Sequence, residues 1–96
     1  MVQAAHHRFT FDDYVTLEAE SGIKHEFVAG SIIAMAGGSP EHAAITANVT
    51  RLLGNALAGR PRRVYSPDLR VRVRATGLGT YADVTVVCGT LELAGP

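Results

Sequence analysis

Residues 25–35 are His25-Glu26-Phe27-Val28-Ala29-Gly30-Ser31-Ile32-Ile33-Ala34-Met35. They form two short apolar runs on either side of a glycine. Such runs, rich in β-branched and aromatic residues, are typical of two antiparallel strands joined by a tight turn. We therefore predict a β-hairpin here, and the other elements are placed around it.

A helix is predicted just before this hairpin. Thr10 and Asp13 have the spacing of a capping box, in which each residue satisfies a backbone N–H at the helix start. The helix is expected to run from Phe11 to about Glu20 and to end at Gly22.

A second, longer helix is predicted after Gly37-Gly38. Ser39-Pro40-Glu41 supplies a serine cap, a proline in the first turn and an acid near the positive end of the helix. Gly59-Arg60-Pro61 would end it. Apolar residues at helical spacing give this helix one apolar face: Ile45, Val49, Leu52, Leu53, Ala56 and Leu57.

The rest of the sequence favours strands. Val64-Tyr65 is expected to be short, and residues 69–74 alternate between apolar and arginine side chains, which predicts a strand with two unlike faces. Residues 76–79 are predicted to form a turn, and residues 83–87 a central, buried strand of little polarity. The order of elements predicts an α/β or α+β layer, with helices against a largely antiparallel sheet.

The composition is that of a small globular domain. The 96 residues include one cysteine, Cys88, so no internal disulfide can form. No segment approaches the roughly 20 apolar residues that span a bilayer, and Met1 to Arg8 lack the apolar run of a signal peptide. We expect residues 1–96 to be part of a single domain with no second domain, a cytoplasmic location and no membrane partner, and we leave a homo-oligomer open.

The charges are unevenly distributed, although the formal net charge is zero. Residues 51–74 hold seven of the nine Lys and Arg residues and one acid, Asp68. A basic segment of this kind suits contact with nucleic-acid phosphates. The alternative is a solvated strand face on which arginine stems cover apolar surface.

A carboxylate at the start of an apolar strand is the first candidate for chemistry. Asp83 follows Tyr81-Ala82 and precedes four apolar or β-branched residues. A buried carboxylate is unfavourable unless it binds a metal or accepts hydrogen bonds, and nucleases use such a group to hold Mg²⁺. From this residue alone, a strand-edge aspartate bonded to local backbone amides is the favoured alternative.

Three other residues carry weaker signals. Glu26 could face inward as a second metal or water ligand, or outward as a surface charge. His42, in the first turn of the long helix, could contact phosphate, although a solvated helix-start residue is the simpler interpretation. Asp68 is better explained as a turn residue paired with a nearby arginine. Gly37-Gly38-Ser39 lacks the lysine and the spacing of a P-loop.

Four segments stand in a fixed order along the chain. They are Lys24-His25-Glu26-Phe27-Val28-Ala29-Gly30, Ala34-Met35-Ala36-Gly37-Gly38-Ser39-Pro40-Glu41-His42, Asp68-Leu69-Arg70-Val71-Arg72-Val73 and Tyr81-Ala82-Asp83-Val84-Thr85-Val86-Val87. Together they resemble the Uma-type restriction endonucleases of the PD-(D/E)XK nuclease superfamily. The resemblance extends from about Phe9 to Gly89, and the order of several linked motifs makes it specific.

The resemblance implies a restriction-endonuclease-like mixed sheet flanked by helices, and Mg²⁺-dependent cleavage of DNA phosphodiesters. Asp83 falls on the family's metal-binding aspartate, and Glu26 on a glutamate of the first hairpin near the same site. We therefore expect both to be catalytic metal ligands facing one cavity. Nucleic-acid contacts are expected from the arginine face and the start of the long helix: Arg70, Arg72, Arg74 and His42.

The sequence departs from the family pattern in three places. Ala82 stands where the family has proline, and Ala29-Gly30 replaces the usual Asp-Gly turn. No (D/E)-x-K element follows Asp83, because the one acid there is Glu92 and the one lysine of the chain is Lys24. We therefore expect the N-terminal portion of a nuclease domain, inactive alone. The rival hypothesis is a non-catalytic nucleic-acid-binding or protein-interaction module derived from the nuclease fold.

Overall fold

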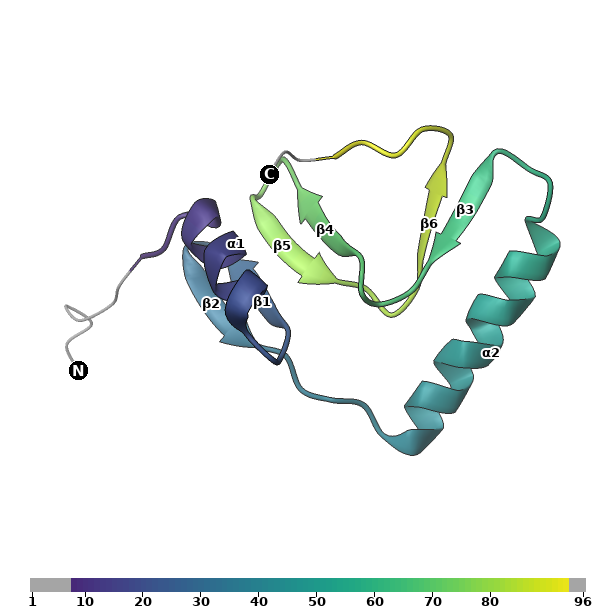
Figure 1. Ribbon diagram of the computed structural model, residues 1–96, viewed down its shortest axis with the longest axis horizontal. Coiled ribbons are helices and arrows are strands. Elements are labelled where there is room, and N and C mark those ends of the chain that lie inside the picture. The colour runs from purple at the N-terminus through teal and green to yellow at the C-terminus, as the bar shows by residue number, and fades with distance from the viewer. Residues whose placement is uncertain (1–7, 94–96) are drawn as a thin grey trace. The chain divides into compact units, whose positions relative to one another are not determined.

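The computed structural model describes residues 8–93, which fall into two compact units. The hairpin unit holds residues 8–36 and 71–80, and the long-helix unit holds residues 37–70 and 81–93. The elements, labelled in Figure 1, are α1 (Phe11–Glu20), β1 (His25–Val28), β2 (Ser31–Ala34), α2 (Pro40–Ala56), β3 (Arg62–Tyr65), β4 (Arg70–Val73), β5 (Leu78–Tyr81) and β6 (Thr85–Cys88).

The sheet of the hairpin unit has the strand order β2-β1-β5-β4. β1 and β2 form the predicted hairpin, in antiparallel register from His25 opposite Ala34 to Val28 opposite Ser31. The two turn residues between them both have positive φ, 49° at Ala29 and 85° at Gly30. This is the mirror-image turn that matches the twist of paired strands.

The core of the hairpin unit is a cluster of three aromatic rings. The predicted capping box forms, since Thr10 and Asp13 exchange both hydrogen bonds, and it starts α1 at Phe11. From α1, Phe11 and Tyr14 reach Phe27 on β1, with ring centroids 5.5–5.7 Å apart. Tyr14 has no exposed surface, which makes it the centre of this core.

Gly79 on β5 lets α1 come close to the sheet. A Cβ atom at this position would lie 2.8 Å from the Tyr14 ring and 3.1 Å from the Phe11 ring. Real Cβ contacts are essentially never so short, and close-packed cores do not absorb added atoms without strain. The glycine is therefore required by packing against α1, not by a turn.

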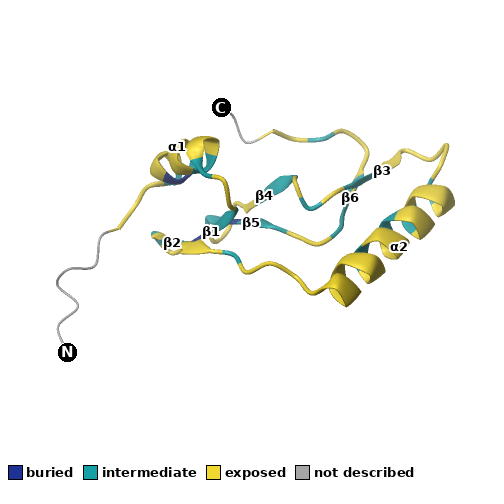
Figure 2. Ribbon diagram, turned by 60° about the horizontal axis from the view of Figure 1, so that its bottom comes forward, coloured by how far each residue is buried: buried dark blue, intermediate teal, exposed yellow. Residues whose placement is uncertain are grey.

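The long-helix unit combines α2 with a two-stranded sheet. Ser39 caps α2 by accepting a hydrogen bond from the His42 N–H (3.1 Å), and Pro40 stands in the first turn, as predicted. β3 and β6 pair antiparallel, from Arg62 opposite Cys88 to Tyr65 opposite Thr85. The exposure of most of α2 is visible in Figure 2.

The apolar residues of α2 are less buried than their spacing suggests. Ile45 and Leu52 are 62 % and 57 % exposed, and no described residue of α2 is fully buried. The half-buried positions of the helix are Thr46, Thr50 and Leu53, of which only Leu53 belongs to the predicted apolar face. The apolar face exists in the helix, but this unit leaves much of it uncovered.

The predicted positions of one turn and one strand are wrong. The turn lies at residues 74–77, where the Gly77 N–H donates to the Val73 carbonyl (2.7 Å), and not at 76–79. Leu78 and Gly79 therefore belong to β5. The strand predicted at 83–87 begins only at Thr85, and it is not central, since β3 is its one partner among residues 8–93. Its apolar residues are half-buried or exposed.

The predicted class is confirmed, because the chain is a mixture of helices and antiparallel strands consistent with a restriction-endonuclease-like fold. Among residues 8–93, no helix is long and apolar enough to cross a membrane. The single domain expected over residues 1–96 stays a prediction, and residues 1–7 and 94–96 lie outside the described part.

Candidate functional site

Asp83 and His42 meet in the long-helix unit. Asp83 lies in the bend between β5 and β6, and its Oδ2 is 3.1 Å from Nε2 of His42 in the first turn of α2. Forty residues of sequence separate the two motifs that carry them, so their contact is a product of the fold. The two atoms form an ion pair when the imidazole is protonated.

The start of α2 fixes the position of His42. Ser39 holds its backbone N–H, and the His42 ring lies against Gly38, where a Cβ atom would be only 2.9 Å from the imidazole Cδ2. Gly38 thus leaves space that the imidazole occupies. Gly38 and Ser39 therefore have local roles in positioning His42, whereas nothing in residues 8–93 lies within 4 Å of a Cβ atom at Gly37.

The Asp83–His42 pair is open to solvent. The Asp83 side chain is 66 % exposed and that of His42 is 51 % exposed. Exposed pairs of this kind contribute little to stability, typically about 0–1 kcal/mol. The expectation that Asp83 starts a buried strand is wrong, so burial no longer argues that it holds a metal. Its accessibility leaves it able to meet a ligand from solvent.

Glu26 has a partner that the sequence did not reveal. Its Oε2 accepts a hydrogen bond from the Thr80 hydroxyl (2.7 Å), and the pair is partly buried. Phe27 pairs with Gly79 between β1 and β5, and neighbouring residues therefore meet on the opposite face of the sheet. Glu26 and Thr80 share that face, away from the aromatic core. Because Glu26 and Asp83 belong to different units, their common cavity stays a prediction.

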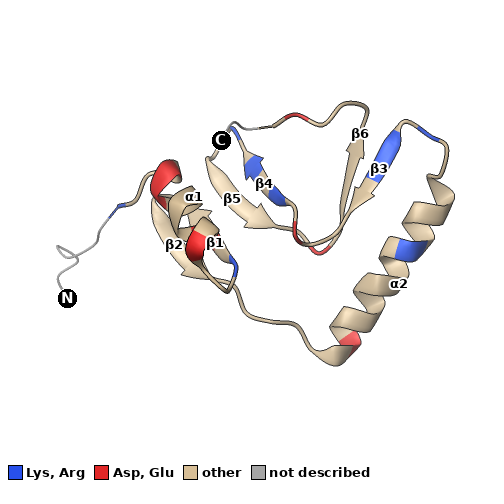
Figure 3. Ribbon diagram, viewed as in Figure 1, with Lys and Arg blue, Asp and Glu red and all other residues tan. Residues whose placement is uncertain are grey.

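The arginines of β4 do not form a uniform solvated row. Arg70 is half-buried, whereas Arg72 and Arg74 are exposed. The guanidinium of Arg72 lies over the Phe11 ring, 4.0 Å from its centroid, so this side chain covers the aromatic core. Figure 3 shows basic residues on β3, β4 and α2. Phosphate contact by Arg70, Arg72 and Arg74 stays a prediction.

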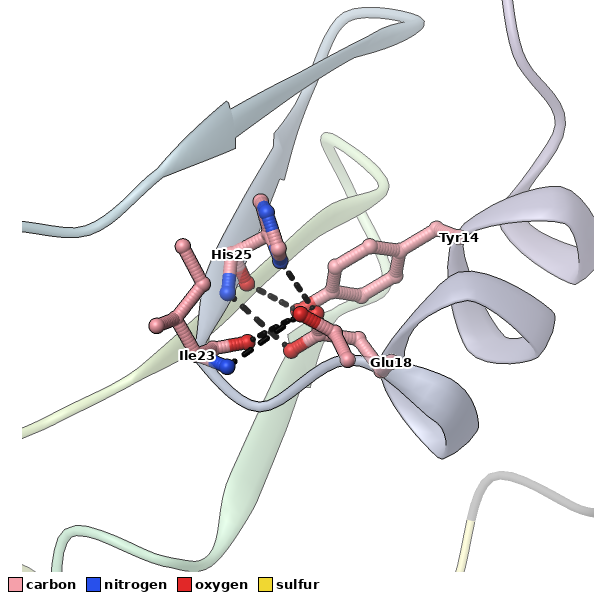
Figure 4. Close-up of polar contacts among 5 residues, drawn as sticks. Tyr14, Glu18, Ile23 and His25 are labelled. Atoms are coloured by element: carbon pink, nitrogen blue, oxygen red, sulfur yellow. Dashed lines mark hydrogen bonds and ion pairs between the residues drawn. The ribbon is translucent and has the colours of Figure 1, made fainter.

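A second polar cluster, missed from the sequence, joins α1 to β1 (Figure 4). Glu18 accepts from the His25 backbone N–H (3.1 Å) and contacts its Nδ1 (2.7 Å), with side-chain exposures of 5 % and 14 %. The Tyr14 hydroxyl donates to the His25 carbonyl (2.6 Å). Tyr14 and Glu18 are one helical turn apart and therefore share a face of α1. An acid on this apolar face was the sequence signal that could have predicted the cluster.

The described residues hold no ready-made metal centre. Among residues 8–93, no three His, Cys, Asp or Glu side chains gather closely enough to bind an ion. The chemistry of Asp83 still fits Mg²⁺, which prefers oxygen ligands and is usually held by one or two carboxylates plus water and phosphate. The imidazole of His42 does not fit it, because nitrogen suits softer ions.

Comparison with known proteins places this chain beside one family. The family model Uma2, described as "Putative restriction endonuclease", matches residues 11–95. Two proteins of Synechocystis sp. (strain ATCC 27184 / PCC 6803 / Kazusa), described as uncharacterized proteins slr1290 and sll1609, are 34 % identical over 77 residues and 32 % identical over 87 residues. These matches cover 80 % and 91 % of the chain, but 40 % and 49 % of the two relatives. No solved structure matches the chain.

Proposed function

The chain belongs to the Uma2 restriction endonuclease family, and from this membership we propose that it serves metal-dependent hydrolysis of DNA phosphodiester bonds, with Asp83 at the reacting site. It spans less than half of the two curated relatives, so the activity of a whole family member is part of the proposal.

The Asp83–His42 contact is the observation that carries this proposal. The family motifs supply these two residues from distant segments, and the fold brings their side chains to 3.1 Å. Both are accessible, and His42 is held by Ser39 and Gly38. An accessible acid beside a positioned imidazole suits a site that meets a phosphate and a metal ion together.

Glu26 is the second residue of the proposed site. It is bonded to Thr80, and Thr80 precedes Asp83 by three residues. The place of Glu26 in the site is proposed from the family resemblance of the first hairpin, and not from a measured distance to Asp83.

In the proposed site, Asp83 would hold Mg²⁺, and Glu26, which accepts a hydrogen bond from Thr80, would add a second carboxylate. A bound Mg²⁺ lowers the pKa of a water ligand and offsets charge on the phosphate. His42 lies against Asp83, where it can orient the carboxylate or donate to a phosphate oxygen. In this proposal the residues of the chain bind the metal ion and position the phosphate. The family's (D/E)-x-K element is absent from these 96 residues.

The rival proposal is a non-catalytic module that binds nucleic acid or a protein. It is favoured by the lack of a three-residue metal cluster among residues 8–93 and by the single lysine, Lys24, of the whole chain. The two proposals differ in whether Asp83 attracts a divalent ion.

Mn²⁺ binding at Asp83 tests the nuclease proposal. Mn²⁺ occupies the same oxygen sites as Mg²⁺, and it broadens the NMR signals of nearby nuclei. We expect substoichiometric Mn²⁺ to broaden the amide signals of residues 41–43 and 81–85, more strongly with a short DNA duplex present. Asp83→Asn should abolish this broadening, and Asp68→Asn in the same unit should leave it. Broadening that is unchanged in Asp83→Asn would favour the rival module.

DNA binding by the arginine strand is tested by its salt dependence. Each phosphate contact adds about 0.9 to the slope of log K against log salt concentration. Arg74→Ala should make the slope shallower by about 1. Arg8→Ala is the matched control, because it also removes one positive charge. The Arg8 side chain donates a hydrogen bond to the Ala29 carbonyl and lies outside the arginine strand, so its loss should leave the slope unchanged. Affinity that ignores salt would contradict phosphate contact.

A further inference from the structure

β2 is an edge strand, and its backbone groups on the side away from β1 are open at Ile32 and Ala34. Just before the strand, the outward Gly30 carbonyl accepts a hydrogen bond from the Phe9 N–H (2.8 Å). Its one partner among residues 8–93 is β1. The Met35 N–H donates to the Lys24 carbonyl (3.0 Å), which marks these two residues as a hydrogen-bonded pair. Such pairs alternate along an antiparallel ladder, so Ile33 also directs its backbone groups toward β1. Ile32 and Ala34 direct theirs to the open edge.

From Ile32 to Ala34 this edge lacks the usual protection against pairing with another strand, whereas Arg8 lies at its start beside Gly30. Natural edge strands carry charged residues, prolines or bulges that prevent such pairing. Residues 31–39 contain no charged residue and no proline. Ile33 is 47 % exposed, and it lies on the sheet face away from the aromatic core, beside the partly exposed Val28. An uncovered apolar side chain therefore stands next to unpaired backbone.

The opposite edge of the same sheet is different. β4 carries Arg70 and Arg72, so two β4 strands side by side would bring like charges together. No such repulsion opposes the pairing of two β2 strands. The contrast makes β2 the edge that can meet an identical strand.

We propose that β2 pairs antiparallel with β2 of a second copy of this chain, about a twofold axis at Ile33. In that register, Ile32 of one copy faces Ala34 of the other, and both have outward backbone groups that exchange hydrogen bonds. Ile33 then packs against its own counterpart. A twofold interface needs a self-complementary patch, which an uncharged antiparallel strand provides.

The dimer is expected to be weak. One short strand per copy buries much less than the roughly 1,200–2,000 Å² of a standard interface. We expect a dissociation constant on the order of 10 μM to 1 mM. Sedimentation velocity over this concentration range should show a monomer–dimer equilibrium without larger species.

Two charge variants test the register. Ile33→Lys and Ile33→Glu each place like charges across the axis, so each protein alone should be monomeric at concentrations where the wild type is dimeric. Their equimolar mixture should dimerise again, because the charges are then opposite. Position 33 lies opposite Glu26 on β1, so Ile33→Lys should keep the hairpin, whereas Ile33→Glu places a like charge there; circular dichroism of each variant verifies that the hairpin is kept.

Leu52→Lys is the control, because α2 presents the other exposed apolar surface described here. It should leave the dimer intact. A wild-type chain that stays monomeric at 1 mM-scale concentrations, dimerisation that persists in Ile33→Lys, or loss of the dimer in Leu52→Lys instead would each overturn the proposal.

Discussion

The 96-residue chain is expected to leave supercoiled plasmid DNA uncut in the presence of Mg²⁺ or Mn²⁺. Phosphodiester hydrolysis needs a metal-held water, charge neutralisation at the phosphate and a group that orients the nucleophile. In the proposed site Asp83 and Glu26 would supply carboxylates, but no lysine follows Asp83 in these 96 residues. Loss of one positioned catalytic group commonly lowers the rate by about 10²–10⁴-fold.

The measurement is an agarose-gel assay of purified chain, with a chelator control and with Asp83→Ala. Lys24 is the one lysine that could replace the missing group, so Lys24→Ala completes the set. Robust, metal-dependent cutting that disappears in Asp83→Ala would show that the chain supplies the third group itself. Loss of that cutting in Lys24→Ala would identify the group.

Tyr14→Ala is expected to destabilise the hairpin unit strongly. Tyr14 is fully buried, stacks near Phe27 and donates a hydrogen bond to the His25 carbonyl. Truncation of a large buried aromatic side chain costs about 3–5 kcal/mol, a large part of the 5–15 kcal/mol that stabilises a typical domain. Urea unfolding followed by circular dichroism and by NMR of residues 25–35 measures the loss.

Two variants separate packing from other effects. Tyr14→Phe keeps the ring and removes the hydroxyl, so it should cost only about 1 kcal/mol. Leu17→Ala truncates an apolar side chain on the same helix that is 40 % exposed, and it should change the stability little. Equal losses in Leu17→Ala and Tyr14→Ala would contradict the view that the aromatic cluster is the core.

The elements predicted correctly were those determined by neighbouring residues. The Thr10–Asp13 capping box, the Ser39 cap and the Ala29-Gly30 turn all form, because each depends on hydrogen bonds or dihedral angles within a few residues. The hairpin register follows from its turn. The α+β class then follows from the order of these elements.

The errors arose where distant packing overrides a local preference. Gly79 was assigned to a turn because glycine is common there, yet it lies in β5 to make space for Tyr14 and Phe11. The apolar run after Asp83 predicted a central strand, yet β6 pairs with β3 in a two-stranded sheet. The composition of a strand does not specify how many strands pair with it. Asp83 was expected to be buried for the same reason and is exposed.

The candidate site was predictable only in part. Asp83 and His42 were named from separate motifs, and the fold places them in contact. Thr80 was not found as the partner of Glu26, because a hydroxyl 54 residues away leaves no periodic or local signal. The Glu18–His25 pair was missed because charged residues are ordinarily assigned to the surface.

The Ala29-Gly30 turn also bears on how this sequence can change over generations. Ala29 has φ of 49°, a conformation that asparagine, aspartate and glycine adopt more readily than alanine. Selection removes only substitutions that drop a protein below the stability it needs. Replacement of Ala29 by one of those three residues should therefore be tolerated, and it should even raise the stability of the hairpin. Replacement by valine or isoleucine, whose β-branched side chains disfavour a positive φ, should be removed by selection.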